Sequence, residues 1–170
     1  MPRNYQPGWD GTTTVGDGRR DVEGRWAAVS PHIPHGSRVL DLGAAQGYFA
    51  ARAASELGCQ VVAIDPDVVD YPGVTAIRQI VAPEDVDLLG TFDVALALSI
   101  LHHMARWRDM LDVLVANATT VIVETPHPNE TLKDPKKNAR LRDIYDATRG
   151  TLLCKTGSIY NTHMRETVLL

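Results

Sequence analysis

A regular alternation of short apolar runs with helical segments is the feature that most constrains the fold. The runs have strand length, and the segments between them include the Ala-rich stretch 48–57 and a stretch over 104–115 whose apolar residues recur at helical spacing. This alternation is typical of a parallel sheet covered by helices on both faces, with right-handed crossovers. The predicted parallel strands span residues 38–42, 60–64, 74–81, 92–98 and 120–123.

The two ends of the chain differ from this central part. The first residues are rich in Gly, Thr and Asp without periodicity, so we expect residues 1–37 to form an arm or lid with a short helix at 21–29. Near the other end, a helix is expected at 136–148. Two final strands, 151–155 and 166–170, lie too close in sequence for a helical crossover and should pair antiparallel.

The composition fits one globular domain and excludes several classes of protein. The 170 residues are 44% hydrophobic, and the net charge of -4 argues against binding nucleic acid across the whole surface. No apolar run approaches the roughly 20 residues that span a bilayer, and the N-terminus lacks the apolar core of a secretory signal. Cys59 and Cys154 are too few for a disulfide framework, so we expect reduced thiols, a cytoplasmic location and no membrane partner.

A glycine-containing loop follows the first predicted strand. In a doubly wound sheet, ligands bind at the carboxyl ends of the strands, where glycines let the backbone turn tightly. The spacing from Gly43 to Gly47 is Gly-x-x-x-Gly, with Ala44 and Ala45 in the turn, and it lacks the middle glycine of a dinucleotide fingerprint. The carboxylate of Asp41 would repel a diphosphate and attract a cation. The loop therefore favours a cationic nucleoside over NAD.

Asp65 ends the second predicted strand, 22 residues after Gly43. A carboxylate at that distance can accept hydrogen bonds from a pair of ribose hydroxyls. Two features at matched positions are a stronger signal than one glycine loop. The alternative is a glycine turn and a capping aspartate that bind no ligand.

Four segments resemble the motifs of the class I S-adenosylmethionine-dependent methyltransferase family. The resemblance implies a doubly wound, mostly parallel α/β sheet of seven strands with an antiparallel C-terminal hairpin, in a domain over residues 38–170. It also implies S-adenosylmethionine as cofactor and S-adenosylhomocysteine as product. The segments are VLDLGAAQG from Val39, VVAIDPD from Val61, FDVALALSILHHM from Phe92 and VIVETP from Val121.

The resemblance assigns a part of the cofactor to each matching position. Asp65 would hold the ribose hydroxyls and Pro66 would lie beside the adenine. Glu84 or its neighbour Asp85 would approach the adenine amino group, and Ser99 would close the pocket. The residues expected around the methionine part are Asp41, Gly43, Ala45 and Gly47.

A general base is needed only if the methyl acceptor must lose a proton. His102, His103 and Glu124 are the predicted catalytic residues, since they follow the fourth and fifth strands at the ligand-binding edge; Tyr48 is a further candidate. The alternative for the two histidines is that one packs structurally and the other caps a helix.

The same edge raises the question of a metal. The side chains of His102, His103, Glu124, His127 and His163 could converge there. A metal-dependent Glu-x-x-Glu-His-His methyltransferase has two glutamates before its histidine pair, and this chain lacks both. We therefore expect no metal.

Several basic and aromatic residues could contact the acceptor. The basic residues near the C-terminal helix could instead form an ordinary solvated helix face. The residues of the arm could instead pack in the ordinary way against the sheet. Because these 170 residues leave little room for a cap domain, the acceptor site is expected from the arm and the segments 126–140 and 156–163. The residues are Lys133, Lys136, Lys137 and Arg140 on one helical face or the approach to it, and Trp9, Arg19, Arg20 and Trp26 in the arm.

The predicted function is methylation of oxygen or nitrogen on a small or medium-sized polar acceptor. An RNA acceptor stays open, as does the oligomeric state. Two alternatives are an NAD-dependent oxidoreductase and a methyltransferase-fold module that binds without catalysis.

Overall fold

The computed structural model describes residues 6–16, 18, 20–157 and 162–170. The predicted arm residue Arg19 lies outside them. None of the described helices is long and apolar enough to cross a membrane. The strands are β1 (Gly8–Trp9), β2 (Thr14–Val15), β3 (Arg38–Leu42), β4 (Gln60–Ile64), β5 (Val74–Ile77), β6 (Phe92–Leu98), β7 (Ala118–Thr125), β8 (Thr151–Gly157) and β9 (Met164–Leu169). The helices are α1 (Val22–Val29), η1 (Ser30–His32), α2 (Tyr48–Leu57), α3 (Pro83–Asp87), η2 (Leu101–His103), α4 (Trp107–Asn117) and α5 (Pro135–Ala147).

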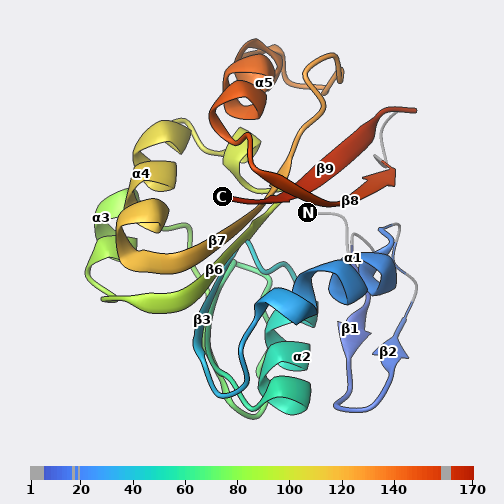
Figure 1. Cartoon of the computed structure of the whole chain (residues 1–170), viewed down its shortest axis with the longest axis vertical. Coiled ribbons are helices and arrows are strands. Elements are labelled where there is room, and N and C mark those ends of the chain that lie inside the picture. Colours follow the sequence, from blue (N-terminus) through green and yellow to red (C-terminus); the bar gives the residue numbers. More distant parts are fainter. Residues whose placement is uncertain (1–5, 17, 19, 158–161) are drawn as a thin grey trace.

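The main sheet has seven strands in the order β5-β4-β3-β6-β7-β9-β8 (Figure 1). The pairs from β5 to β7 are parallel, and β9 runs antiparallel to both β7 and β8. The strand order reverses at β3, which pairs with β4 on one side and β6 on the other. The predicted fold class is confirmed, including the antiparallel C-terminal hairpin.

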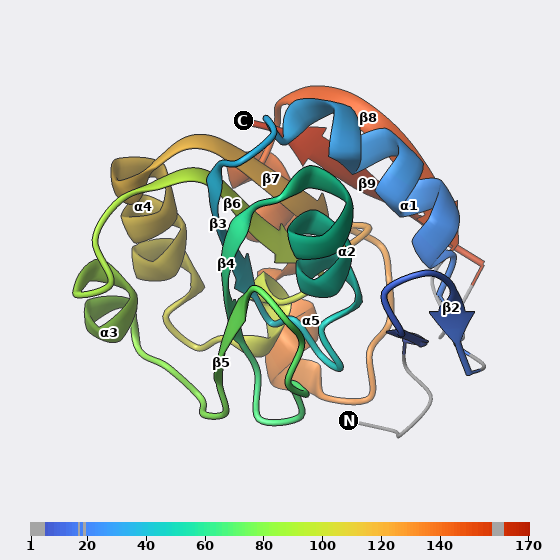
Figure 2. The same cartoon turned by 90° about the horizontal axis from the view of Figure 1, so that it is seen from below.

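Alternate residues of the strands enter two hydrophobic cores on opposite faces of the sheet. Val39 and Leu96 pack with α1 and α2, whereas Leu40 and Ala95 pack with α3, α4 and α5. Figure 2 shows α1 and α2 on one side of the strands and α3 and α4 on the other. Strands buried on both faces explain the nearly continuous apolar runs of the sequence.

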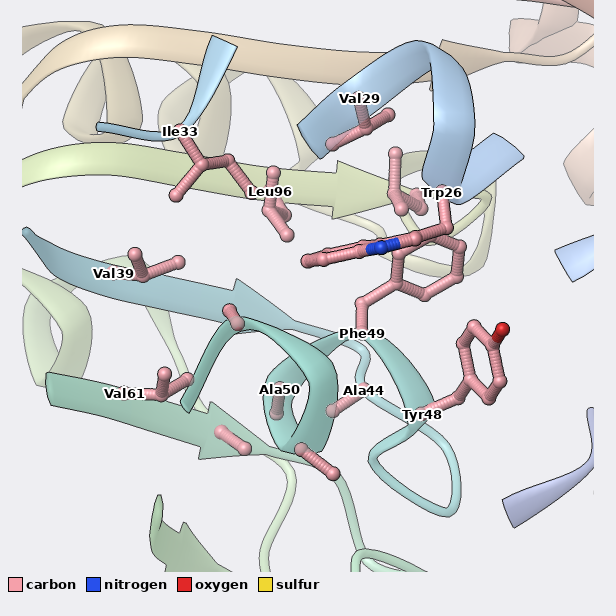
Figure 3. Packing of buried hydrophobic residues seen from close by; sticks show 14 of the residues in the cluster. Trp26, Val29, Ile33, Val39, Ala44, Tyr48, Phe49, Ala50, Val61 and Leu96 are labelled. Carbon is pink, nitrogen blue, oxygen red and sulfur yellow. The ribbon is translucent and has the colours of Figure 1, made fainter. Parts of the chain in front are cut away.

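The N-terminal segment packs onto α2 rather than standing apart. Trp26 of α1 lies against Phe49 of α2 in the same core as the sheet residues (Figure 3). The sequence predicts no regular structure before residue 21, yet β1 and β2 form a short hairpin. The side chain of Asp10 accepts hydrogen bonds from the backbone of Thr12 and Thr13 and closes its turn. The division of the chain at residue 37 stays a prediction.

The region around β5 differs from the sequence prediction. The strand ends at Ile77 and not at residue 81, because its neighbour β4 ends at Ile64, the pairing partner of Ile77. The sequence analysis also missed α3, which begins at Pro83 and whose Asp85 carboxylate accepts from the backbone N–H of Ala82.

Replacing Arg52 with alanine should loosen the N-terminal segment. The Arg52 guanidinium lies over the rings of Trp9 and Trp26 and pairs with Glu23 and Glu56. Each cation–π contact contributes about 0.5–2 kcal/mol and each partly exposed ion pair less than about 1 kcal/mol, so we expect a loss of about 1–3 kcal/mol.

Thermal unfolding of Arg52→Ala, compared with that of a control variant, tests this expectation. The matched control is Arg149→Ala, which breaks an exposed pair with Asp146 and a single, longer contact of the guanidinium with the Tyr145 ring. Equal melting temperatures for the Arg52 and Arg149 variants would show that the arginine stack does not hold the segment.

Candidate cofactor pocket and acceptor side

The loop after β3 brings its backbone close to the neighbouring strand ends. The N–H groups of Gly43 and Ala44 both donate to the carbonyl of Ile64 at the end of β4. Gly43 has a φ of 75°, and a Cβ added there would lie 2.6 Å from Cγ1 of Ile100. Glycine is therefore required by both conformation and space. Gly47 and Ala45 also have positive φ, of 89° and 51°.

A pocket of about 300 Å³ opens beside this loop, at the carboxyl ends of β3, β4 and β6. It lies where the strand order reverses, the expected ligand position in a doubly wound sheet. Gly43, Asp65 and Pro66 line it, as the sequence predicts. Apolar side chains supply much of the remaining wall; they are Leu42, Ile64, Ile80, Val81, Ile100 and Met104.

Asp41 lies in β3, two residues before Gly43 of the loop, and its carboxyl group is buried. Its Oδ2 atom has no hydrogen-bond partner among the described residues. Burial raises its pKa to about 7, although the Ala50 backbone N–H and the charge of Arg25 act in the opposite direction. The negative charge of Asp65 repels that of Asp41 and so also raises the Asp41 pKa. An orphaned, desolvated carboxyl group fits a cationic ligand such as the ammonium of S-adenosylmethionine.

Replacing Asp41 with asparagine should change how stability depends on pH. The pKa is about 7 in the folded chain and ordinarily 3.8, so the folded state keeps a proton that the unfolded state loses. The free energy of unfolding of the wild type should therefore fall as pH rises between these values, by about 1.4 kcal/mol per pKa unit. Asparagine does not ionise, so the variant should not show this fall in the free energy of unfolding.

Thermal melts across pH provide the measurement. The variant should gain stability relative to wild type from about pH 4 to about pH 8. A difference that stays constant with pH would contradict the raised pKa of Asp41.

Glu84 does not line the pocket. Its exposed carboxylate pairs with Arg106, 2.7 Å from Nη2. Asp85 is occupied as the cap of α3. Ile80 and Val81, which follow the end of β5, line the wall where the sequence predicts an acidic side chain.

Glu124, near the end of β7, lies in a buried ion cluster that consists of Arg20, Arg25, Glu124, Glu130 and Arg165. Glu124 accepts from Arg20 and pairs with Nε of Arg25 at 2.8 Å. Arg165 of β9 makes a two-point contact with Glu130, at 2.9 and 2.7 Å. The sequence analysis missed Arg25, Glu130 and Arg165 as site residues. A glutamate directly after the apolar run 121–123 was the available signal, since a buried carboxylate requires partners.

Ser99 joins this cluster to the pocket. Its Oγ donates to Glu124 and accepts from Arg165 at 3.0 Å, and the next residue, Ile100, lines the pocket. Its φ of 63° is unusual for a residue other than glycine. Burial alone would raise the pKa of Glu124, but Arg25, Arg20 and the Ser99 hydrogen bond together lower it. Glu124 is thus an ionised carboxylate held by cations.

The two predicted catalytic histidines have different surroundings. His102 is buried, and its Nδ1 has no hydrogen-bond partner among the described residues. Burial, followed by the charges of His103 and Arg165, lowers its pKa well below the ordinary value. His103 lines the pocket, and desolvation followed by the charge of Lys137 lowers its pKa to about 4. Both rings are neutral at pH 7.

Lys137 determines which nitrogen of His103 carries the proton. Its Nζ lies 2.8 Å from Nδ1 of His103. An ammonium has only protons to donate, so Nδ1 accepts and Nε2 carries the hydrogen. While this contact holds, His103 is a hydrogen-bond donor with no free lone pair for a base.

The other candidate residues are placed as follows. The Tyr48 hydroxyl donates to Glu23 on the side of the N-terminal segment. The His127 and His163 rings stack on one another, with centroids 4.4 Å apart. Within the described ranges, no group of three or more His, Cys, Asp or Glu side chains is arranged to hold a metal. Arg140 of α5 donates to the Met104 carbonyl, whereas Lys136 of α5 and Lys133, which precedes the helix, are exposed.

A family model described as a methyltransferase domain matches residues 17–164. The chain is 36% identical over 70 residues to tRNA U34 carboxymethyltransferase of Psychrobacter arcticus, covering 40% of this chain and 20% of that protein. It is 31% identical over 134 residues to the O-antigen chain terminator bifunctional methyltransferase/kinase WbdD of Escherichia coli, covering 62% and 18%. The matches thus span about a fifth of the length of these relatives.

Solved structures support the same fold. A WbdD crystal structure superposes with a TM-score of 0.72 at 23% identity, covering 100% of this chain and 45% of that one. The N-terminal domain of EvdMO1, crystallised with SAH (S-adenosylhomocysteine) and D-fucose, gives a TM-score of 0.63 at 16% identity and covers 99% and 90%. The chain therefore belongs to the methyltransferase-domain family, within the class I S-adenosylmethionine-dependent methyltransferases.

Proposed function

We propose that this chain transfers the methyl group of S-adenosylmethionine to oxygen or nitrogen of a small or medium-sized polar acceptor. The observation that carries the proposal is the pocket at the reversal of strand order, with Asp65 on its wall and the orphaned Oδ2 of Asp41 behind its loop. These groups suit a ligand with a ribose and an ammonium and no phosphate.

Each part of the cofactor has a matching part of the site. Asp41 and the loop 43–47 would hold the methionine end, and Asp65 would accept from the ribose hydroxyls. Pro66 and Ile80 would hold the adenine, in place of a contact from Glu84. When bound, the cofactor supplies an activated methyl group, so the protein has to bind, orient and exclude water.

The geometry favours positioning roles for the three predicted catalytic residues. Glu124 is held by arginines, His103 has its lone pair engaged by Lys137, and His102 is buried and neutral. None of them has the free lone pair and near-neutral pKa of an effective general base. An acceptor that needs no proton removed suits this site.

The residues expected to surround the acceptor come from three segments. These are the N-terminal segment with Arg20, the stretch 126–140, and the part of 156–163 that the structure describes. We propose an arm at 1–37 over a domain at 38–170, with a small molecule as acceptor; an RNA acceptor is the alternative. The described cysteines, Cys59 and Cys154, are unpaired, in keeping with a cytoplasmic location.

Mass spectrometry of cell extract incubated with the protein and methyl-labelled S-adenosylmethionine tests this proposal. We expect labelled methyl in an extract component, and less of it with Asp65→Ala. Cofactor binding without any labelled product would instead favour a binding module. Binding of NAD in place of S-adenosylmethionine would favour an oxidoreductase.

A further inference from the structure

Three buried guanidinium groups gather on the acceptor side of the pocket. Arg20, Arg25 and Arg165 are 4%, 0% and 2% exposed; the first two belong to the N-terminal segment and the third to β9. Desolvating a guanidinium is costly unless anions lie close to it. Within the described part of the chain, two carboxylates, Glu124 and Glu130, pair with these three cations, and the charge of Arg25 also reaches the buried carboxyl group of Asp41.

The cluster adjoins the pocket in which the cofactor is proposed to bind. Ser99 and Glu124 lie at the carboxyl ends of β6 and β7, and Leu98 pairs in register with Glu124. The chain passes directly from Ser99 in the cluster to Ile100 in the pocket wall. The cations therefore lie beside the cofactor pocket, on the side of the antiparallel hairpin.

A second observation also points to a ligand. His102 is 2% exposed, and its ring lies 4.3 Å from that of His103, which lines the pocket. Nδ1 of His102 and Nε of Arg20 are buried without a hydrogen-bond partner among the described residues. Buried polar atoms are nearly always satisfied by protein, water or ligand. The charge of Arg20 reaches the His102 ring, where it helps to lower the histidine pKa, so the two side chains belong to one electrostatic environment.

We infer that the acceptor presents an anionic oxygen, of a carboxylate or a phosphate monoester, to Arg20 and Arg165 beside His102, and that this oxygen receives the methyl group. The inference rests on the proposed function. It explains why the site has several buried cations and no free base, because an anionic oxygen carries no proton that a base would have to remove. Guanidinium groups match the geometry of both kinds of anion.

The transfer step balances without a proton. The acceptor oxygen forms a bond to the methyl carbon while the carbon–sulfur bond breaks, and both electrons of that bond remain on sulfur. One negative charge on the acceptor and one positive charge on sulfur disappear together. The products are a methyl ester and a neutral thioether.

Titration of the S-adenosylhomocysteine-loaded protein with inorganic phosphate, and separately with acetate, tests the inference. We expect one of the two anions to bind and so to identify its class. The affinity should fall about tenfold or more in Arg20→Gln and in the double variant Arg165→Gln/Glu130→Gln, which removes one cation and one anion together and so protects the fold. Arg108→Gln is the matched control, because Arg108 is exposed on α4 and packs over Trp107.

The outcomes separate this inference from the proposed function. Failure of S-adenosylhomocysteine to bind would contradict the proposed function itself. If it binds but neither anion does, or if the anion binds equally well to the double variant, the anionic acceptor is overturned. Labelled product from extract gives an independent check. Alkali releases volatile methanol from a carboxylic methyl ester and leaves a methyl phosphate intact, whereas label on nitrogen or on a neutral hydroxyl would contradict the inference.

Discussion

Replacement of Asp65 with alanine is expected to weaken S-adenosylmethionine binding about a hundredfold. The carboxylate lines the pocket at the end of β4, where it would accept hydrogen bonds from two ribose hydroxyls. A hydrogen bond to a charged group contributes about 1.5–3 kcal/mol, and about 1.4 kcal/mol corresponds to a tenfold change in affinity. Isothermal titration calorimetry of the variant and wild type measures the difference.

Two further variants separate binding from folding. Oδ1 of Asp65 also accepts from the Asp67 N–H at 2.9 Å, and Asp65→Asn keeps that acceptor while removing the charge. Asp70→Ala removes a nearby exposed carboxylate that pairs with Arg78, and it should leave affinity unchanged. Unchanged affinity in a folded Asp65→Ala protein would refute the ribose role.

Replacement of Glu124 with alanine should lower stability by about 3–5 kcal/mol. The change leaves Arg20 and Arg25 buried without their shared carboxylate, and an uncompensated buried charge is far costlier than a broken surface pair. For a chain of this length each kcal/mol shifts the melting temperature by about 2–4 °C. Thermal and denaturant unfolding would both detect the change.

The control removes an ion pair that faces water. Asp146→Ala breaks the exposed pair with Arg149 and should cost less than about 1 kcal/mol. A similar small loss for Glu124→Ala would show that the cluster does not stabilise the fold. Glu124→Gln keeps the side-chain size, and an unaltered pH profile of methyl transfer in this variant would support a positioning role over that of a base.

Local sequence patterns were sufficient to predict most of the sheet. Residues such as Val94 and Leu96 alternate between the cores with Ala95 and Ala97, so β6 is apolar without interruption from Val94 to Leu98. The glycine loop and Asp65 were predictable because parallel strands bring their carboxyl ends to one edge. The hairpin of β1 and β2 depends on a weaker local signal, the turn that Asp10 closes.

The buried ion cluster could not be predicted in the same way. Its contacts join residues far apart in the sequence, such as Arg20 with Glu124 and Glu130 with Arg165, and no local period reports them. The same reason explains the different placement of Glu84, which depends on Arg106 and on the early end of β5. The sequence predicts Glu124 at the ligand-binding edge because it follows the fifth strand. Its pairing with Arg20 and Arg25, which makes it unsuited to act as a base, could not be predicted.

Calorimetric titration with S-adenosylmethionine and, separately, with NAD tests the central claim most directly. The account predicts saturable binding of one S-adenosylmethionine per chain, a rise in melting temperature with added cofactor, and no binding of NAD. Absence of both binding heat and thermal shift at millimolar S-adenosylmethionine would contradict it.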